Sequence, residues 1–255
     1  MRKFAVLLFL ALGCSQDESS DFTCTLSKII STTSNSRTET TYSYNSEGKV
    51  SRQTRISNGV TTFDYTYFYG TDGKVVKVED IDEISQSEYD ASGRLKTVIE
   101  STLDGIEKQR FSYEWLDGKV RITLFQMGKP NPIQVNEVEF LNENIVRDVI
   151  QSFTGNDPNV LMSISDTKYE DFDSALSAFY IVSRARPGYN PIISKNNPRK
   201  STSSQQSFVN GVLASESNSI TNYSYQYNSS NATIRSTSTT GSFTVTTEII
   251  YENCN

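Results

Sequence analysis

A short motif that occurs four times constrains the fold of this chain more than any other feature. Each copy has an aromatic residue, a short polar linker, a glycine, a basic residue and an aliphatic residue. The four glycines are Gly48, Gly73, Gly93 and Gly118. Glycine adopts positive φ without strain, so this pattern is typical of a tight reversal between two strands. The motif predicts repeated β-hairpins, and by itself it indicates no reaction and no ligand.

Further turn signals divide most of the chain into short alternating runs. Pairs such as Asn58-Gly59, Asp104-Gly105 and Asn210-Gly211 continue the series of reversals. A turn about every 10–13 residues predicts an antiparallel meander of roughly a dozen strands. The run 60–69 places four aromatic residues on one face, while serine and threonine dominate many alternate positions. We therefore predict a mostly β fold, an antiparallel meander of repeated hairpins in a curled or barrel-like sheet.

Two segments are degenerate copies of the motif, and a third region, between them in the chain, breaks the hairpin pattern. Residues 140–146 and 227–231 look like degenerate copies in which asparagine replaces glycine. Asp173 is an N-cap candidate before apolar residues at helical spacing, which predicts one short helix near 172–180 capping an open end of the sheet. The Pro- and Asn-rich stretch 186–198 predicts a long loop, either functional or merely irregular.

The repeated motif resembles the YD repeat of RHS-type proteins. It is also similar to small bacterial lipoproteins of unknown function that are built from degenerate copies of that repeat. The resemblance covers about 42–146 and faintly 227–234, and Tyr89-Asp90 is the one true YD pair. It implies the hairpin fold. RHS arrays are far longer and enclose a toxin, a role that these few copies cannot fill.

The first residues have the pattern of an export signal. Arg2 and Lys3 precede an apolar run, 4–12, that is too short to span a bilayer. The sequence up to Cys14 resembles a bacterial lipobox, which implies cleavage after residue 13 and lipidation of Cys14. An ordinary secretory signal that contains a cysteine is the alternative. We expect a signal peptide at 1–13, an acidic tether at 14–21 and one β-rich domain at 22–255.

The acidic tether suggests where the protein is located. Residues 16–18, Gln-Asp-Glu, resemble the export signal of lipoproteins carried to the outer face of some Gram-negative outer membranes. The other interpretation is a flexible linker that carries no sorting signal. The resemblance implies a protein held to the outer membrane by a lipid, facing the cell exterior, and anchored rather than spanning.

The other two cysteines lie at opposite ends of the predicted domain. Cys24 belongs to the first strand-like run, and Cys254 follows the last. Disulfides persist in exported proteins, so we predict a Cys24–Cys254 bridge, with two unpaired thiols as the alternative. Such a bridge requires the first and last strands to come close, most simply as neighbours, which favours a closed or strongly curled sheet.

Composition removes several classes of function. The net charge is −6 and there is no basic run, which argues against a nucleic-acid partner. The chain has no histidine, which excludes histidine triads and histidine-based zinc sites. We expect no cofactor and no metal site.

Carboxylates are the remaining candidates for site chemistry. The cluster 79–83 offers oxygen ligands for calcium, but a solvated hairpin turn explains it as well. Another acidic group could include a glycosidase pair, although its spatial separation cannot be read from the sequence. Residues 173–175 resemble an O-glycosylation acceptor and equally suit a helix N-cap. The acidic group comprises Asp166, Glu170, Asp171 and Asp173.

The functional hypotheses follow from these limits. Fourteen tyrosines and thirteen phenylalanines suggest sugar stacking, but aromatic residues are also ordinary cross-strand partners. Trp115 is the exception of interest because it stands at a turn. The leading hypothesis is a non-enzymatic, membrane-anchored platform for an unknown protein or glycan partner. The alternatives are a carboxylate-dependent glycan hydrolase, and an envelope-assembly or lipid-handling factor that requires a deep apolar concavity between sheet and helix.

Overall fold

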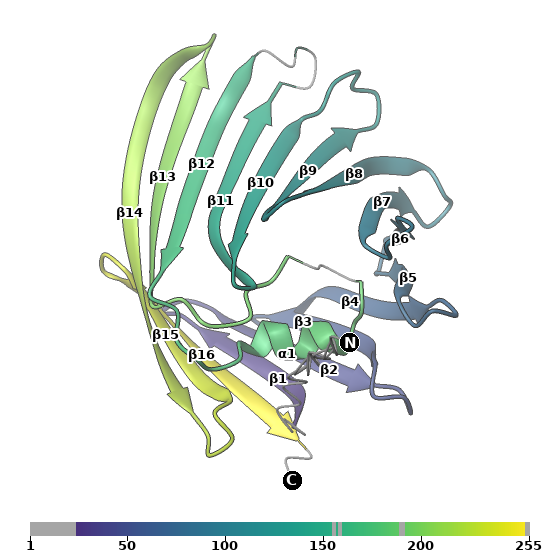
Figure 1. The fold of residues 1–255 in the computed structure, drawn as a ribbon, viewed down its shortest axis with the longest axis vertical. Coiled ribbons are helices and arrows are strands. Elements are labelled where there is room, and N and C mark those ends of the chain that lie inside the picture. The colour runs from purple at the N-terminus through teal and green to yellow at the C-terminus, as the bar shows by residue number, and fades with distance from the viewer. Residues whose placement is uncertain (1–23, 155–156, 158–159, 189–191, 253–255) are drawn as a thin grey trace, which may run out of the picture.

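The computed structural model describes residues 24–252 apart from 155–156, 158–159 and 189–191. Sixteen antiparallel strands form one closed barrel in which neighbours in sequence are neighbours in space (Figure 1). The prediction of a mostly β, barrel-like meander of hairpins is confirmed, although sixteen strands exceed the predicted dozen. The strands are β1 (Thr25–Thr32), β2 (Arg37–Tyr44), β3 (Val50–Ser57), β4 (Val60–Tyr69), β5 (Val75–Glu79), β6 (Glu83–Tyr89), β7 (Leu95–Thr102), β8 (Glu107–Leu116), β9 (Lys119–Gln126), β10 (Gln134–Leu141), β11 (Asn144–Phe153), β12 (Leu161–Glu170), β13 (Lys200–Val209), β14 (Val212–Tyr227), β15 (Thr233–Thr240) and β16 (Phe243–Glu252).

The barrel closes between its first and last strands. β1 pairs with β16 from Thr25 opposite Glu252 to Thr32 opposite Thr246. Closure gives every strand two partners, so no edge is left for pairing with another chain. The expectation that the terminal strands are neighbours is confirmed.

Successive turns alternate between the two ends of the barrel. The proximal rim carries the β2–β3, β4–β5, β6–β7, β8–β9, β10–β11 and β14–β15 turns, together with the start of β1 and the end of β16. The distal rim carries the other hairpins. All four motif glycines lie at the proximal rim with φ of 75°, 78°, 78° and 64°, as the motif predicts. Asn142 and Asn231 take φ of 50° and 58° in the degenerate copies, which confirms those turns as well.

The single described helix, α1 (Ala178–Arg184), begins later than predicted. Its N-cap is Ser177, whose hydroxyl accepts a hydrogen bond from the Tyr180 backbone N–H. Asp173 was the expected cap, but its carboxylate holds the Ala175 and Asn197 backbone N–H groups instead. The helix therefore begins at Ala178 rather than near residue 173, and the predicted range is wrong by about one and a half turns.

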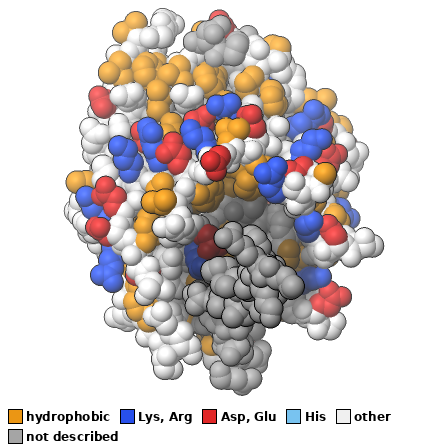
Figure 2. Space-filling view, viewed as in Figure 1, with side chains coloured by type: hydrophobic (Ala, Val, Ile, Leu, Met, Phe, Trp, Pro, Cys, Tyr) orange, Lys and Arg blue, Asp and Glu red, His pale blue; other side chains and the backbone are white. Residues whose placement is uncertain are grey.

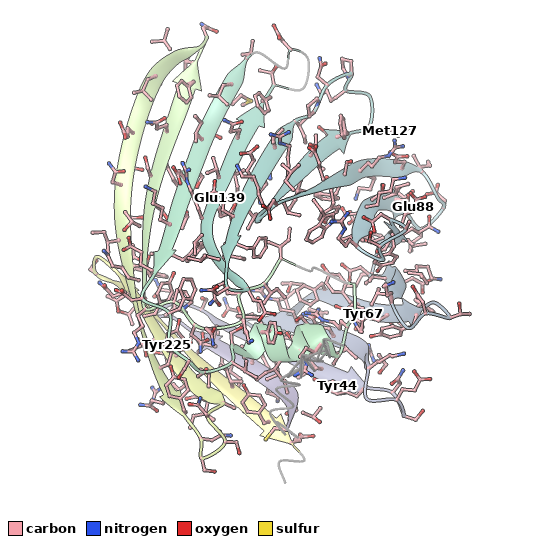
Figure 3. All side chains as sticks on the ribbon, in the orientation of Figure 1. Tyr44, Tyr67, Glu88, Met127, Glu139 and Tyr225 are labelled. Atoms are coloured by element: carbon pink, nitrogen blue, oxygen red, sulfur yellow. The ribbon has the colours of Figure 1, made fainter. Side chains whose placement is uncertain are left out.

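The main apolar core lies inside the barrel, between α1 and one wall. Ala178 and Val182 of α1 pack with buried side chains of β1 to β5 and β16. Figure 3 shows Tyr44, Tyr67 and Tyr225 around α1. The wall residues in this core are Leu26, Ile29, Tyr42, Val50, Tyr67, Val75, Val78 and Ile249. Residues alternating with them therefore face outward.

The outward face carries ion pairs between neighbouring strands. Arg147 of β11 pairs with Asp166 of β12 at 2.7 Å, and its guanidinium holds the pKa of that carboxyl below its usual range. Arg121 of β9 pairs with Glu137 of β10 at 2.7 Å. Figure 2 shows positive and negative side chains interspersed across the wall formed by β8 to β14. This part of the exterior therefore carries charges of both signs that pair between neighbouring strands.

Candidate functional site: a plugged barrel interior

The connection between β12 and β13 crosses the proximal mouth of the barrel. We call residues 171–199 the plug segment. It contains α1, and its described residues contact β3, β5, β6, β11, β14 and β15. Figure 1 shows α1 inside the ring of strands. The predicted long irregular loop is thus a structural element that spans the barrel interior.

Asp173 and Asn197 fasten the two ends of the plug segment to each other and to the wall. The Asp173 carboxylate accepts hydrogen bonds from the Asn197 backbone N–H at 3.2 Å and side-chain amide at 3.3 Å. It also accepts one from the Tyr227 hydroxyl at the end of β14. The Asn197 amide donates to Thr233 Oγ1 at 3.2 Å. Asn197 and Thr233 are buried, so water cannot replace these bonds at little cost.

The middle of the plug segment binds the starts of two repeat strands. The Val50 N–H donates to the Ala185 carbonyl at 2.9 Å, and the Val75 N–H donates to the Pro187 carbonyl at 3.0 Å. These strand ends would otherwise leave buried backbone donors unpaired. Gly188 lies directly against Tyr89: a Cβ there would be 2.7 Å from the ring carbon Cε1. Glycine is required at 188 for this approach.

Arg186 extends from the plug segment into the apolar core. Its Nη1 donates to Gln53 Oε1 at 2.8 Å and to the Tyr67 hydroxyl at 2.9 Å. Its guanidinium also lies 6.0 Å from the centroid of the Tyr42 ring. Gln53 and Arg186 are buried. These contacts connect the plug segment to β2 through the Tyr42 ring, and to β3 and β4 through hydrogen bonds to Gln53 and Tyr67.

The returning part of the plug segment binds β11. The Ile145 N–H donates to Ser194 Oγ at 3.0 Å, and the Asn196 N–H donates to Asn144 Oδ1 at 2.7 Å. Ser177 Oγ donates to the Ser194 carbonyl at 2.8 Å, which joins the start of α1 to this return. The plug segment is therefore held on opposite walls of the barrel.

The aromatic residues of the turn motif form a ladder along the proximal rim. Each of these side chains donates a hydrogen bond to a backbone carbonyl of the preceding strand. Burial raises the pKa of Tyr69 and of Tyr89 to about 12, so both phenols stay protonated and donate at neutral pH. The bonds run from Tyr44 to Leu26, from Tyr69 to Val50, from Tyr89 to Val75 and from Trp115 to Leu95.

The basic residue of each of the first three copies completes the ladder. It lies over the aromatic ring of the next copy, with the cation 5.2–6.0 Å from the ring centroid. The contacts are Lys49 over Tyr69, Lys74 over Tyr89 and Arg94 over Trp115. At Gly93 a Cβ would lie 2.8 Å from Lys74 Nζ, so the glycine also makes room for the preceding base. The motif therefore specifies packing between hairpins as well as the turn.

A cavity of about 550 Å³ lies between the plug segment and the wall formed by β14, β15, β16 and β1. Its apolar lining includes Ile29, Ile249 and Phe179, and its aromatic side chains with hydroxyls include Tyr169, Tyr223 and Tyr225. Burial raises the pKa of Tyr169 to about 12. Serine and threonine side chains from β15 and β16 line the same space: Thr233, Ser236, Ser238 and Thr247. The size and the mixed lining suit a small molecule.

The structure engages the candidate carboxylates in different contacts. Asp166 lies on the outer face with Arg147, and Glu170 pairs with Lys200 at 3.0 Å. Asp173 holds the plug segment. In the 79–83 cluster, Glu79 pairs with Lys77 and Glu83 pairs with Lys108. Among the residues that the structure describes, no group of three or more acidic or cysteine side chains is arranged to hold a metal ion.

The remaining predicted site residues divide into those that are described and those that are not. Trp115 belongs to the aromatic ladder and donates to the Leu95 carbonyl at 2.7 Å. Cys24 is buried directly before β1. Cys14 and Cys254 lie outside the described residues, so lipidation and the disulfide stay predictions. Within the described ranges, no helix is long and apolar enough to cross a membrane.

Sequence reasoning missed the cavity residues. Tyr223, Tyr225 and Tyr227 alternate along β14, a pattern that the sequence does display. Such alternation predicts one common face, but it does not say that α1 lies opposite that face. The signal that could have pointed to a cavity is the long connection 171–199 in a chain of otherwise short turns.

Comparison with known proteins supports the fold alone. No family model matches the chain, and no curated protein matches it. A porin-like protein from Bacteroides uniformis is similar in structure with a TM-score of 0.55 at 14% identity, covering 89% of this chain and 96% of that one. A porin-like protein from Bacteroides vulgatus has a TM-score of 0.50 at 12% identity, covering 89% and 98%. The chain thus shares the antiparallel barrel fold of bacterial porin-like proteins.

Proposed function

We propose that this protein is a non-enzymatic, lipid-anchored barrel of the bacterial outer membrane that binds a small amphipathic molecule in its interior. The observation that carries the proposal is the cavity of about 550 Å³ between the plug segment and the barrel wall. It is the concavity between sheet and helix that a lipid-handling or ligand-binding role requires. Isoleucine and aromatic side chains would cover an apolar body, and the serine and threonine hydroxyls would bond a polar end.

The charged exterior favours an anchored barrel over a spanning one. A barrel that spans an outer membrane presents an apolar band about 25 Å tall to the lipid. The outward positions include the ion pairs Arg121–Glu137 and Arg147–Asp166 on this wall, and Arg52–Asp64 between β3 and β4. Charged side chains facing lipid are costly near the bilayer midplane. We therefore assign the porin-like fold here to a water-facing protein held by a lipid on Cys14.

The aromatic ladder supports the resemblance to YD repeats. In three of the copies the aromatic residue donates a hydrogen bond to a backbone carbonyl of the preceding strand and lies under the base of the preceding copy. A degenerate repeat with this packing would form the wall of a small barrel, rather than the long shell that RHS repeats form around a toxin. The glycan hydrolase remains the weaker alternative, because the candidate carboxylates are engaged in other contacts.

A bulky residue inside the cavity is expected to abolish binding of an apolar probe. Ser238 lines the cavity, whereas its neighbour Thr237 faces the other side of the same strand. Ser238→Trp should raise the dissociation constant of N-phenyl-1-naphthylamine by a factor of ten or more, roughly 1.4 kcal/mol. Thr237→Trp is the matched control and should leave it unchanged. Fluorescence titration of the full chain carrying Cys14→Ser measures both. Equal affinities in the two variants would place the probe elsewhere and refute the cavity as the site.

Loss of the anchor is expected to release the protein from membranes. Cys14→Ser removes the thiol that the lipid would occupy, so the chain should move from the membrane pellet to the soluble fraction of lysed cells. Fractionation with detergent-free washes measures the shift, and a Ser15→Ala variant controls for the nearby change. Retention of the Cys14→Ser protein in the washed membrane fraction contradicts the anchor.

A further inference from the structure

A second cavity lies on the inner face of the wall formed by β6, β7 and β8. Its volume is about 300 Å³, at the lower end of the range for small-molecule sites. Gly188 of the plug segment lines it, so the face concerned is the inner one. Figure 1 shows these strands across the barrel from β14, which lines the cavity described above. The lining from the strands includes Ser85, Val98, Glu100 and Phe111.

The register of the three strands gathers a carboxylate, a hydroxyl and an aromatic ring on this face. Ser85 of β6 is directly opposite Glu100 of β7. Phe111 of β8 is opposite Val98, which precedes Glu100 by two residues on the same strand. Side chains that are opposite or diagonal on one face of antiparallel strands are close enough to interact. One small bound group can therefore contact Ser85, Glu100 and Phe111 together.

Glu100 is the only charged side chain among the described residues that line this cavity. Its Oε2 accepts a hydrogen bond from the Gln109 side-chain amide, and no described Lys or Arg forms an ion pair with it. Lys108 and Arg110, the two bases of β8, pair with other carboxylates. Glu100 is partly exposed, so a solute can reach its carboxylate. A negative charge on an otherwise neutral cavity wall attracts a cation.

From these observations we propose that the second cavity binds a small primary amine in its ammonium form. An ammonium group has three hydrogen-bond donors and no acceptor, so it can donate to Glu100 Oε1 and to the Ser85 hydroxyl together. The ring of Phe111 favours the same cation, because the face of an aromatic ring is negative. Val98 would cover a short apolar body beside the ammonium. This site is independent of the proposed function, since it uses a different cavity.

The chemistry of the lining favours an amine over a metal ion and over a neutral solute. Calcium takes about six to eight oxygen ligands, whereas one carboxylate and a few hydroxyls stand here beside apolar walls. The part of the chain that the structure describes holds no group of three or more acidic or cysteine side chains suited to a metal ion. A neutral solute in this space would leave the Glu100 charge partly desolvated and without a counter-ion.

Isothermal titration calorimetry of the full chain carrying Cys14→Ser, with phenethylamine as the probe, tests this site. We expect sub-millimolar binding of the amine, and binding of phenethyl alcohol that is weaker by a factor of roughly ten or more, since the alcohol lacks the charge. Glu100→Gln keeps the shape and one acceptor oxygen but removes the charge, so it should weaken amine binding by a similar factor.

Glu88→Gln is the matched control for Glu100→Gln. Glu88 belongs to the same wall (Figure 3), but it is exposed and alternates along β6 with the cavity residues Ser85 and Ser87, so it lies on the outer face. The Glu88→Gln variant should bind phenethylamine as the parent chain does.

Several outcomes would overturn the proposal. No binding of phenethylamine at millimolar concentration means that the cavity takes no amine. Equal affinities of the Glu100→Gln and Glu88→Gln variants remove the carboxylate from the site. Equal affinities for phenethylamine and phenethyl alcohol show that the cavity selects no charge, and displacement of the amine by an equal concentration of calcium chloride assigns Glu100 to a metal ion. Circular dichroism checks that each variant is folded, and the comparison of amine with alcohol on the parent chain decides the matter without any variant.

Discussion

Chemical reduction is expected to lower the free energy of unfolding of this protein by about 5 kcal/mol. A Cys24–Cys254 bridge closes a loop of nearly the whole domain, and the chain-entropy model assigns about that value to so long a loop. The closed barrel supplies the required proximity: Thr25, next to Cys24, is paired with Glu252, two residues before Cys254. For a domain of this size the melting temperature should fall by roughly 10–20 °C.

Thermal unfolding with and without dithiothreitol measures this effect. The double variant Cys24→Ala with Cys254→Ala is the control, and its melting temperature should not respond to the reductant. Peptide mapping of the non-reduced protein should recover the two cysteines in one cross-linked species. Free thiols at both positions in protein taken from the oxidising compartment would refute the bridge, although the β1–β16 pairing would remain.

Removal of the Asp173 carboxylate is expected to destabilise the plug segment by about 3–5 kcal/mol. Asp173→Ala deletes the acceptor for Ala175, Asn197 and Tyr227 at once. Hydrogen bonds to a charged group contribute about 1.5–3 kcal/mol each, and the buried Asn197 would be left without its strongest acceptor. Hydrogen exchange of the α1 amides should accelerate, because the helix is continuous with this tether.

Two other substitutions distinguish this role from the general loss of a surface charge. Asp173→Asn keeps the shape and one acceptor oxygen, so it should cost less than Asp173→Ala. Glu170→Ala removes a neighbouring carboxylate that pairs with Lys200 on the surface, and it should cost no more than about 1 kcal/mol. Chemical denaturation measures all three. Similar midpoints for Asp173→Ala and Glu170→Ala would show that the tether contributes little.

The hairpins were predictable because their signals are local. Gly93 follows an aromatic residue by four positions and precedes a base, and these few residues decide the reversal wherever the hairpin lies. The same holds for Asn142 and Asn231, which take positive φ where the degenerate motif places them. A curled or barrel-like sheet was also predicted, since a bridge between cysteines at both ends of a meander would bring the terminal strands together. Closure itself is seen only in the structure.

The helix was misplaced for the opposite reason. Asp173 has the local pattern of an N-cap, yet its carboxylate binds Asn197, which lies 24 residues further along the chain, and Tyr227, 54 residues away. Local propensity cannot weigh a hydrogen bond to a residue that distant. Ser177 caps α1 instead, and its backbone N–H donates to the Lys195 carbonyl in the returning part of the plug segment.

The sequence by itself determined the repeated hairpin and the position of its glycines, because each depends on residues within one or two turns. Only the tertiary structure decided that the 171–199 connection enters the barrel, that Arg186 meets Gln53 and Tyr67, and that a cavity remains beside them. Arg186 and Gln53 are 133 residues apart. Such contacts form only when the barrel has closed and its inner face has become a surface on which the plug segment can bury apolar area.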